Sequence, residues 1–298
     1  MTALRLLPAV LLVARVATAQ ETPAADRAQL RQLVLERIAQ VPGSTVGVVF
    51  REVGGGTAFF VNPDTLFHAA STMKVPVMIE YFRALDAGRL RKDQDLLLGT
   101  EFKSIVDGSP YSLSPGVDSD SSVFERVGQH VPLRWLVERM IVRSSNLATN
   151  TLIEVLDAKR VDATARSLGA TNMKVLRGVE DGKAFQQGLN NQTSARDLAT
   201  LLEAIETGRA ASSSSCREMI AVLAAQEFNE WIPAGLPSGT RVAHKTGWIT
   251  GVTHDAAIIY PPGRKPYVLV VLTKGIAERP VASRLIADIS RMVWRAKE

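Results

Sequence analysis

A serine and a lysine at helical spacing could make a nucleophile and its base. Ser71 and Lys74 stand three residues apart at the start of the helical pattern 71–81. If a helix begins at or just before Ser71, the Lys74 ammonium comes within hydrogen-bonding reach of the Ser71 hydroxyl. Taken alone, the spacing is more typical of an N-cap serine and a surface lysine. The chemistry therefore depends on what else the chain supplies.

Lys74 can accept a proton only in its neutral form. Burial among Met73, Val75 and Val77 would lower its pKa, and so would a second cation nearby. A helix that starts here also turns backbone N–H groups toward an oxyanion forming at Ser71. The pattern therefore predicts attack on a carbonyl by an activated serine.

Two further short motifs combine hydroxyl, amide and ammonium groups. Ser144-Ser145-Asn146 lies between two helical patterns, and its plain alternative is an N-cap for a helix starting near Leu147. Lys245-Thr246-Gly247 follows a strand pattern that ends at His244, and its alternative is an ordinary strand exit. The glycine would permit a close approach of backbone.

Strand patterns occur near both ends of the chain, and helical patterns lie between them. The first helix has Thr22-Pro23 as its N-cap and first residue. We expect helices at 30–38, 133–142, 146–156, 196–205 and 281–294, a polar loop at 109–122, and strands at 45–50, 57–61, 242–244, 256–260 and 267–272. The first two strands form a hairpin, and residues 261–264 form the turn between the last two.

These elements predict an α+β fold, an α/β/α sandwich with an additional all-α lobe. An antiparallel sheet of about five strands is built from both termini and covered by the terminal helices, with the helical insert as a second lobe. We expect residues 20–68 and 226–298 in the sheet lobe and 69–225 in the all-α lobe. The active site is expected in the crevice between the lobes.

The first 19 residues have the pattern of a secretory signal peptide. Arg5 precedes the apolar run 6–13, and Ala17-Thr18-Ala19 fits a small-residue cleavage site. The run is too short to span a bilayer. We therefore expect a periplasmic or secreted protein with no stable membrane span after cleavage.

Composition narrows the possible partners. The 298 residues are 46% hydrophobic and 22% charged, as in an ordinary globular protein. Cleavage would remove two arginines and no acids, so the formal charge would fall from +5 to +5 − 2 = +3. A positive charge this small does not indicate a nucleic-acid-binding protein. Cys216 is the single cysteine, so no intramolecular disulfide can form, and the four histidines are far apart. We expect no metal, no cofactor and a monomer.

In the order Ser-x-x-Lys, Ser-x-Asn, Lys-Thr-Gly, the three motifs match the signature of penicillin-binding proteins and class A β-lactamases. The chain resembles class A β-lactamases and related secreted serine hydrolases over essentially its whole mature length. Residues 67–77, 140–150, 245–256 and 261–264 look like the family's pattern in order and approximate spacing.

The resemblance implies an acyl transfer with a small-molecule β-lactam as substrate. Ser71 would attack the lactam carbonyl, Lys74 would accept the proton directly or through water, and Ser144 would relay it to the leaving nitrogen. Backbone N–H groups of Ser71 and Trp248 would hold the oxyanion. Three side chains would bind the substrate: Asn146 its side-chain amide, and Lys245 with Thr246 its carboxylate. Lys245 would also be the second cation that lowers the pKa of Lys74.

The chain departs from the family where the acyl-enzyme is hydrolysed. The family places the responsible glutamate in an Ω-shaped loop, in the pattern Glu-x-x-Leu-Asn with an arginine two residues earlier. Here Glu180 lies three residues after Arg177, and Leu189-Asn190 follows nine residues later. We expect a remodelled loop in which Glu180 activates water, with Asp181 as the second candidate. The alternative is a surface carboxylate paired with Arg177 or Lys183.

Two further positions differ or stay open. Ser145 stands where the family usually has an aspartate that supports the turn through hydrogen bonds, so we expect a weaker turn. His254 either assists carboxylate binding or is a half-exposed strand histidine.

The sequence thus predicts a serine β-lactamase acylated at Ser71. The alternative is a D-Ala-D-Ala peptidase, an esterase or a penicillin-binding protein of the same fold that deacylates lactams poorly. A binding protein that reports covalent capture is disfavoured, because no second hydrophobic span exists to carry a signal.

Overall fold

The computed structural model describes residues 24–297. The expected signal segment and the Thr22-Pro23 cap lie outside the described residues. The helices and strands follow one another along the chain in this order: α1 (Ala24–Ala39), β1 (Thr45–Glu52), β2 (Ala58–Val61), β3 (Phe67–His68), α2 (Lys74–Asp86), β4 (Asp95–Leu97), β5 (Glu101–Lys103), β6 (Pro110–Ser112), β7 (His130–Pro132), α3 (Leu133–Val142), α4 (Asn146–Leu156), α5 (Ala158–Ser167), α6 (Gly182–Gln186), β8 (Gln192–Thr193), α7 (Ala195–Glu206), α8 (Ser213–Ala224), β9 (Arg241–Ile249), β10 (Val252–Tyr260), β11 (Tyr267–Lys274) and α9 (Arg279–Arg295).

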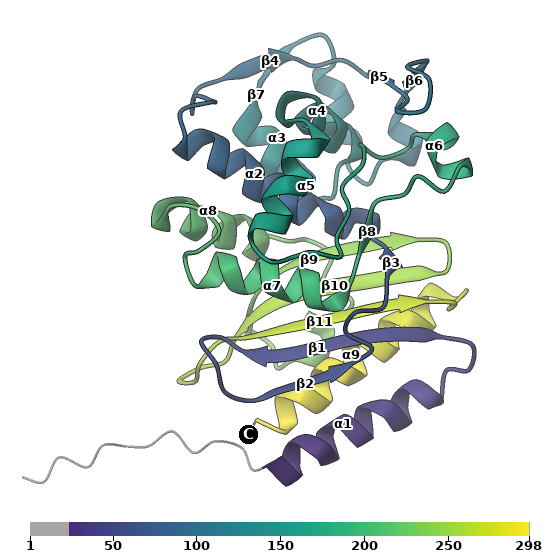
Figure 1. Ribbon diagram of the computed structural model, residues 1–298, viewed down its shortest axis with the longest axis vertical. Helices are drawn as coiled ribbons and strands as arrows, with labels where there is room; N and C mark the ends of the chain where they lie inside the picture. Colours follow the sequence, from purple (N-terminus) through teal and green to yellow (C-terminus); the bar gives the residue numbers. More distant parts are fainter. Residues whose placement is uncertain (1–23, 298) are drawn as a thin grey trace, which may run out of the picture.

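Five of the strands form one antiparallel sheet in the order β2-β1-β11-β10-β9 (Figure 1). The two ends of the chain meet where β1 pairs with β11. This sheet, the terminal helices and the helical insert confirm the predicted fold class. The division of the chain at residues 69 and 226 stays a prediction.

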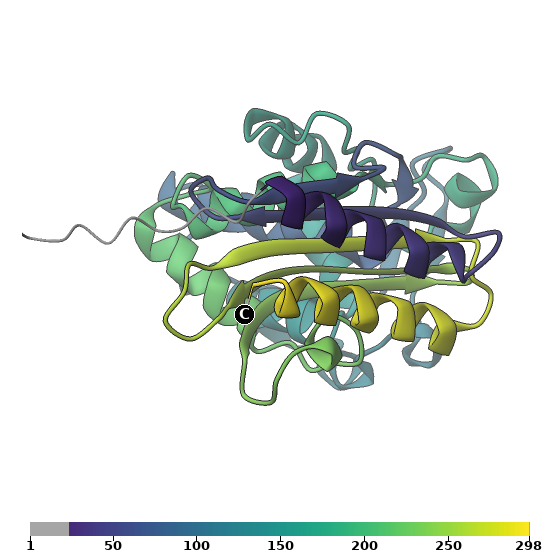
Figure 2. The same cartoon turned by 90° about the horizontal axis from the view of Figure 1, so that it is seen from below.

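Helices cover both faces of the sheet. Figure 2 shows α1 and α9 lying side by side across one face, and α7 packs against β10 and β11 on the other. In β11, Tyr267, Leu269 and Val271 face the terminal helices, while the alternate residues Val268 and Val270 join the core of the helical side. Because both faces are buried, this strand reads in sequence as one continuous apolar run.

Helix α2 runs through the core of the helical side. Almost all of its residues are buried, including Lys74 and Glu80, so its sequence is apolar over most of its circumference. A short 3₁₀ helix, Ala70–Met73, precedes it and packs against β9 and β10. The first turn of the predicted helix is therefore a 3₁₀ turn at the edge of the sheet.

The structure also differs from the sequence-based expectation in two places. The region expected to be all-α, residues 69–225, contains short strands: β4 pairs with β7, β5 pairs with β6, and β8 pairs with β3, which lies just before this region. Strand β9 continues to Ile249, so Lys245-Thr246-Gly247 lies within the strand and not after its exit. β9 forms an edge of the five-stranded sheet, and its pairing with β10 supports this longer strand.

Candidate active site

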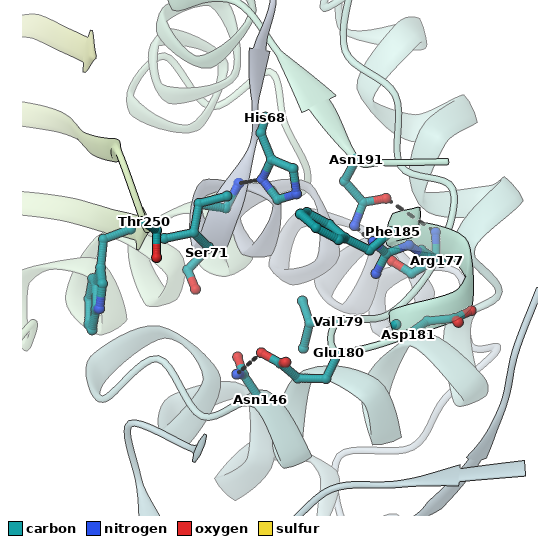
Figure 3. A pocket seen from close by; sticks show the side chains of 14 residues that line it. His68, Ser71, Asn146, Arg177, Val179, Glu180, Asp181, Phe185, Asn191 and Thr250 are labelled. Carbon is teal, nitrogen blue, oxygen red and sulfur yellow. Dashed lines mark hydrogen bonds between the residues drawn. The ribbon is translucent and has the colours of Figure 1, made fainter. Parts of the chain in front are cut away.

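Ser71 lines a cavity of about 350 Å³ between the sheet edge and the helical side. Figure 3 shows Ser71, Asn146 and Glu180 pointing into this cavity from different segments. Trp248 and Thr250, at the end of β9 and in the following turn, line it as well. The predicted nucleophile thus lies in a pocket together with two predicted substrate-binding residues, Asn146 and Trp248, and the predicted deacylation carboxylate.

The backbone before the nucleophile is strained. Ala70 has a φ of +45°, in the left-handed region that a residue with a Cβ rarely adopts. Its N–H donates a hydrogen bond of 3.0 Å to Nδ1 of His68, which also lines the cavity. His68 was not singled out from the sequence, since a lone histidine two residues before Ala70 follows no motif.

Gly247 allows β9 to come close to this turn. A Cβ at position 247 would lie 2.9 Å from the backbone nitrogens of both Ser71 and Thr72. Only a glycine fits this contact without a shift, as the close approach expected from the sequence requires. Trp248 follows directly, with its ring packed against Phe228 and Trp231.

The Lys74 ammonium is fully buried and donates to the turn at 144–146. Its Nζ lies 2.7 Å from the Ser144 carbonyl oxygen, 3.2 Å from Ser144 Oγ and 2.9 Å from Asn146 Oδ1. Within residues 24–297, no hydrogen bond joins Lys74 to the Ser71 hydroxyl, and the role of Lys74 as proton acceptor, directly or through water, stays a prediction. Helical spacing places the two backbones together, but three acceptors on the neighbouring turn hold the ammonium.

Burial sets the protonation of both lysines. Burial lowers the pKa of Lys74 to about 7, although the Asp118 and Glu180 carboxylates raise it. Lys245 is also fully buried and donates to Ser144 Oγ at 3.0 Å and to the Thr246 carbonyl at 2.9 Å. Its burial and the charge of Lys74 hold the pKa of Lys245 well below its usual value. The Ser144 hydroxyl therefore bridges two ammonium groups of lowered pKa.

The turn that carries Ser144 is itself strained and is supported from another segment. Ser144 has a φ of +58°, and Ser145 caps α4 by accepting a bond of 3.2 Å from the Ala148 N–H. The Asp118 carboxylate, from the loop before α3, accepts the N–H groups of Asn146 and Leu147 at 3.0 and 2.8 Å. Asp118 could not be singled out from the sequence, because it belongs to no motif and lies 28 residues from Asn146.

Glu180 reaches the cavity through an unusual backbone conformation. Its φ is +61°, and its Oε1 accepts a hydrogen bond of 3.2 Å from Asn146 Nδ2 (Figure 3). Lys183 pairs instead with Asp107, at 2.8 Å, and Arg177 donates to the Leu189 and Gly178 carbonyls. The alternative of a surface ion pair between Glu180 and either cation is therefore wrong among the described residues.

Asp181, the second candidate for the deacylation base, has a structural role. It is buried, and its oxygens accept from Ser104 Oγ at 2.9 Å, the Ile105 N–H at 3.0 Å and the Ala184 N–H at 3.1 Å. It caps α6 and fastens this loop to the one at residues 104–105. With its oxygens engaged in this way, the geometry favours Glu180 as the carboxylate available to the cavity.

The loop 177–190 is closed at its base by polar side chains. Asn191 Oδ1 accepts the Leu176 and Arg177 N–H groups, and its Nδ2 donates to the Arg177 carbonyl at 2.9 Å. The Arg177 guanidinium donates to Asn190 Oδ1 at 3.0 Å. These bonds define the neck of the remodelled loop expected from the sequence.

Two residues near β9 complete the site. Thr246 Oγ1 is buried and has no hydrogen-bond partner among the described residues. Neither Thr246 nor Lys245 is among the residues that line the cavity. His254 is fully buried, with Nε2 2.9 Å from the His68 carbonyl oxygen, and burial lowers its pKa to about 4. The half-exposed position expected for His254 is wrong, because the ring lies inside the packing between β10 and the segment before Ser71, while a role in carboxylate binding stays untested.

The described residues contain no cluster of histidine, cysteine, aspartate and glutamate side chains arranged to hold a metal ion. None of the helices between residues 24 and 297 has the length and apolar composition to cross a lipid bilayer.

Comparison with known proteins places this fold and site in a family. The model of the β-lactamase enzyme family matches residues 27–296. β-Lactamase AST-1 of Nocardia asteroides is 28% identical over 84% of this chain and 78% of its own length. A β-lactamase structure from Sphaerobacter thermophilus is 30% identical, covers 88% of this chain and 96% of its own, and has a TM-score of 0.75. The structure of PBP-A is 29% identical over 92% and 96% of the two chains, with a TM-score of 0.76.

The chain therefore belongs to the β-lactamase enzyme family, and the resemblance inferred from its three motifs is confirmed.

Proposed function

We propose that this protein is a serine hydrolase of the class A type that opens β-lactam rings through an acyl-enzyme on Ser71. One observation carries the proposal. Ser71 and Glu180 line the same cavity. The buried Lys74 donates to the half-buried Asn146, which in turn donates to the Glu180 carboxylate. Membership of the β-lactamase enzyme family supports the same activity.

Acylation begins at Ser71. Its Oγ bonds to the lactam carbonyl carbon, and its proton passes to neutral Lys74, directly or through a water molecule. The backbone N–H groups of Ser71 and Trp248 stabilise the oxyanion. The carbon–nitrogen bond then breaks as the proton reaches the ring nitrogen through the Ser144 hydroxyl, which Lys74 and Lys245 both contact.

Substrate recognition uses groups around the same turn and strand. Lys245 and the Thr246 hydroxyl, which has no partner among the described residues, bind the lactam carboxylate. The Asn146 amide turns from Glu180 to the amide of the substrate side chain. The substrate thereby replaces the Glu180 contact of Asn146 and supplies a partner for the buried Thr246 hydroxyl.

Deacylation requires a second base. Water attacks the ester carbon, Glu180 takes its proton, and the ester bond breaks as Ser71 recovers a proton. The peptidase or poorly deacylating alternative is not favoured, because the Glu180 carboxylate lines the cavity and is held there by Asn146.

Replacing Ser71 with alanine tests the nucleophile. The Ser71→Ala variant should lose hydrolysis of benzylpenicillin and of a cephalosporin, and peptide mapping should find no adduct. Ser238→Ala, at an exposed serine in the turn before β9, is the matched control and should retain both. An adduct on any other serine of the Ser71→Ala variant would overturn the proposal.

A further inference from the structure

We propose that Asp118 is a positioning residue that holds the Ser144–Asn146 turn in its active conformation, in place of the aspartate that position 145 lacks. The inference deepens the proposed function and rests on it. The two positions are 27 residues apart, yet Ser145 Oγ donates to Asp118 Oδ2 at 3.3 Å. The end of the side chain at position 145 therefore lies beside the Asp118 carboxylate, at the same helix start.

The Asp118 carboxylate satisfies backbone donors that the turn leaves open. The first N–H groups of a helix have no partner within it. At the start of α4, Asn146 N–H contacts both carboxylate oxygens, at 3.1 and 3.0 Å, and Leu147 N–H donates at 2.8 Å. The Ser145 hydroxyl accepts the Ala148 N–H, so the Asn146 and Leu147 donors depend on Asp118. A negative charge at a helix N-terminus is also electrostatically favourable.

Asp118 is itself held in place. The Asp120 N–H donates to Asp118 Oδ1 at 2.9 Å, and the Asp120 carboxylate pairs with Arg139 of α3 at 2.5 Å. Because α3 ends just before Ser144, the loop and the turn are fastened to the same helix. The carboxylate therefore has a fixed position from which to restrain the strained Ser144 backbone.

This restraint matters for the reaction because Lys74 bonds to the turn. Lys74 donates to the Ser144 carbonyl and to Asn146 Oδ1. The charged groups that face Lys74 are the Asp118 and Glu180 carboxylates and the Lys245 ammonium. Asp118 thus acts twice: it fixes the acceptors of Lys74 and adds a negative charge that raises the pKa of Lys74.

The test measures the rate of Ser71 labelling by a fluorescent penicillin as a function of pH. Asp118→Asn keeps the size but loses the charge and one acceptor oxygen, so labelling should slow by about 10²-fold. The acid limb of the variant's pH–rate profile, where the labelling rate rises with pH, should move to lower pH. The reason is that Lys74 loses a neighbouring carboxylate that raises the Lys74 pKa. Simple loosening would admit water to Lys74 and move the limb the other way. Asp93→Asn, on an exposed loop, is the control and should label as wild type does.

The exchange variant Asp118→Ser/Ser145→Asp tests whether the two positions share one task. It should label at least tenfold faster than Asp118→Ser alone. An exchange variant no faster than Asp118→Ser, or an Asp118→Asn limb that stays in place or moves to higher pH, overturns the inference.

Failure of the proposed function gives a different result. If the penicillin does not label wild-type Ser71, the chemistry proposed above is wrong. A ¹³C-NMR titration of the Lys74 side chain in wild type and Asp118→Asn then still decides the role of Asp118. A lower Lys74 pKa in the variant supports it, and an unchanged or higher one overturns it.

Discussion

The spacing of Ser71 and Lys74 in the sequence predicts where Lys74 lies but not which groups its ammonium contacts. The Ser71-x-x-Lys74 spacing correctly indicated a serine at a helical start close in sequence to a buried lysine, while the role of Ser71 as nucleophile stays a prediction. It did not indicate that the ammonium would donate to three acceptors at residues 144 and 146. Those acceptors lie at least 70 residues away in sequence, so their position depends on tertiary packing.

The pH dependence of acylation follows from the pKa of Lys74. Burial lowers that pKa to about 7, so the lysine is mainly protonated below this pH and mainly neutral above it. Because only the neutral amine can accept the Ser71 proton, the acylation rate should rise with pH through about 7. Stopped-flow acylation by benzylpenicillin measures the profile. A rate that is flat or falls through this range would contradict the role of Lys74.

Lys74→Arg separates the charge from the base. An arginine keeps the positive charge but stays protonated, so acylation should slow by about 10²–10⁴-fold while reversible binding of substrate remains. Single-turnover kinetics at several substrate concentrations measures both quantities. Near-wild-type acylation would show that Lys74 has only a structural role.

At the scale of elements, the edge strand β9 and the turn before α2 form one unit. Gly247→Ala would place a Cβ 2.9 Å from the backbone nitrogens of Ser71 and Thr72 and force the two segments apart. Acylation should fall by about 10²-fold, and the free energy of unfolding should drop by about 1–3 kcal/mol.

Gly99→Ala is the matched control for this substitution. Position 99 has an ordinary φ, and a Cβ added there would meet no heavy atom within 4 Å, so an alanine should be tolerated. Thermal denaturation and single-turnover acylation distinguish the two variants. A Gly247→Ala protein as active as Gly99→Ala would contradict the close approach at β9.

The neck of the loop 177–190 gives an element-scale prediction for deacylation. Asn191→Ala removes three bonds between the ends of the loop, so Glu180 should lose its position while Ser71 keeps its own. We expect deacylation to slow more than acylation, measured as a rise in the steady-state fraction of acyl-enzyme. Equal slowing of both steps would contradict this separation.

Regular elements were predictable and the loop was not, for a physical reason. Helices 133–142 and 146–156 have apolar residues at helical spacing, because these residues are buried. The strands of the sheet have alternating or continuous apolar residues, because one or both of their faces are buried. By contrast, the base of the loop 177–190 and the turn at residues 144–146 are held by single polar side chains that bond to distant backbone. These side chains are Arg177 and Asn191 for the loop and Asp118 for the turn. Such bonds leave no period in the sequence, so the sequence predicted neither of them.

At the scale of the whole molecule, both ends of the chain contribute to one sheet and to the same core. The pairing of β1 with β11 and the packing of α1 on α9 join segments more than 200 residues apart. The three motifs thereby converge from the 3₁₀ turn, the start of α4 and the edge strand β9. The order of the three motifs in sequence indicated the family because proteins of this family share the fold that brings the motifs together.

The secretory pattern in the sequence predicts the mature form. Expressed with its first 19 residues in a Gram-negative host, the protein should appear in the periplasm, begin at Gln20 and behave as a monomer. Osmotic-shock fractionation, N-terminal sequencing and light scattering measure these properties. An uncleaved protein retained in the cytoplasm would contradict the signal-peptide interpretation.

In the proposed mechanism Glu180 completes a hydrolytic cycle on Ser71, and intact-protein mass spectrometry over time with benzylpenicillin measures this role. Wild type should show the Ser71 adduct only briefly. Glu180→Gln should acylate and then accumulate the adduct, because a general base contributes about 10²–10⁴-fold to the rate. Glu125→Gln, at an exposed carboxylate, should behave as wild type. Two results would contradict the role of Glu180 as the deacylation base. One is a stable adduct on wild type, and the other is full turnover by Glu180→Gln while Asp181→Asn accumulates the adduct.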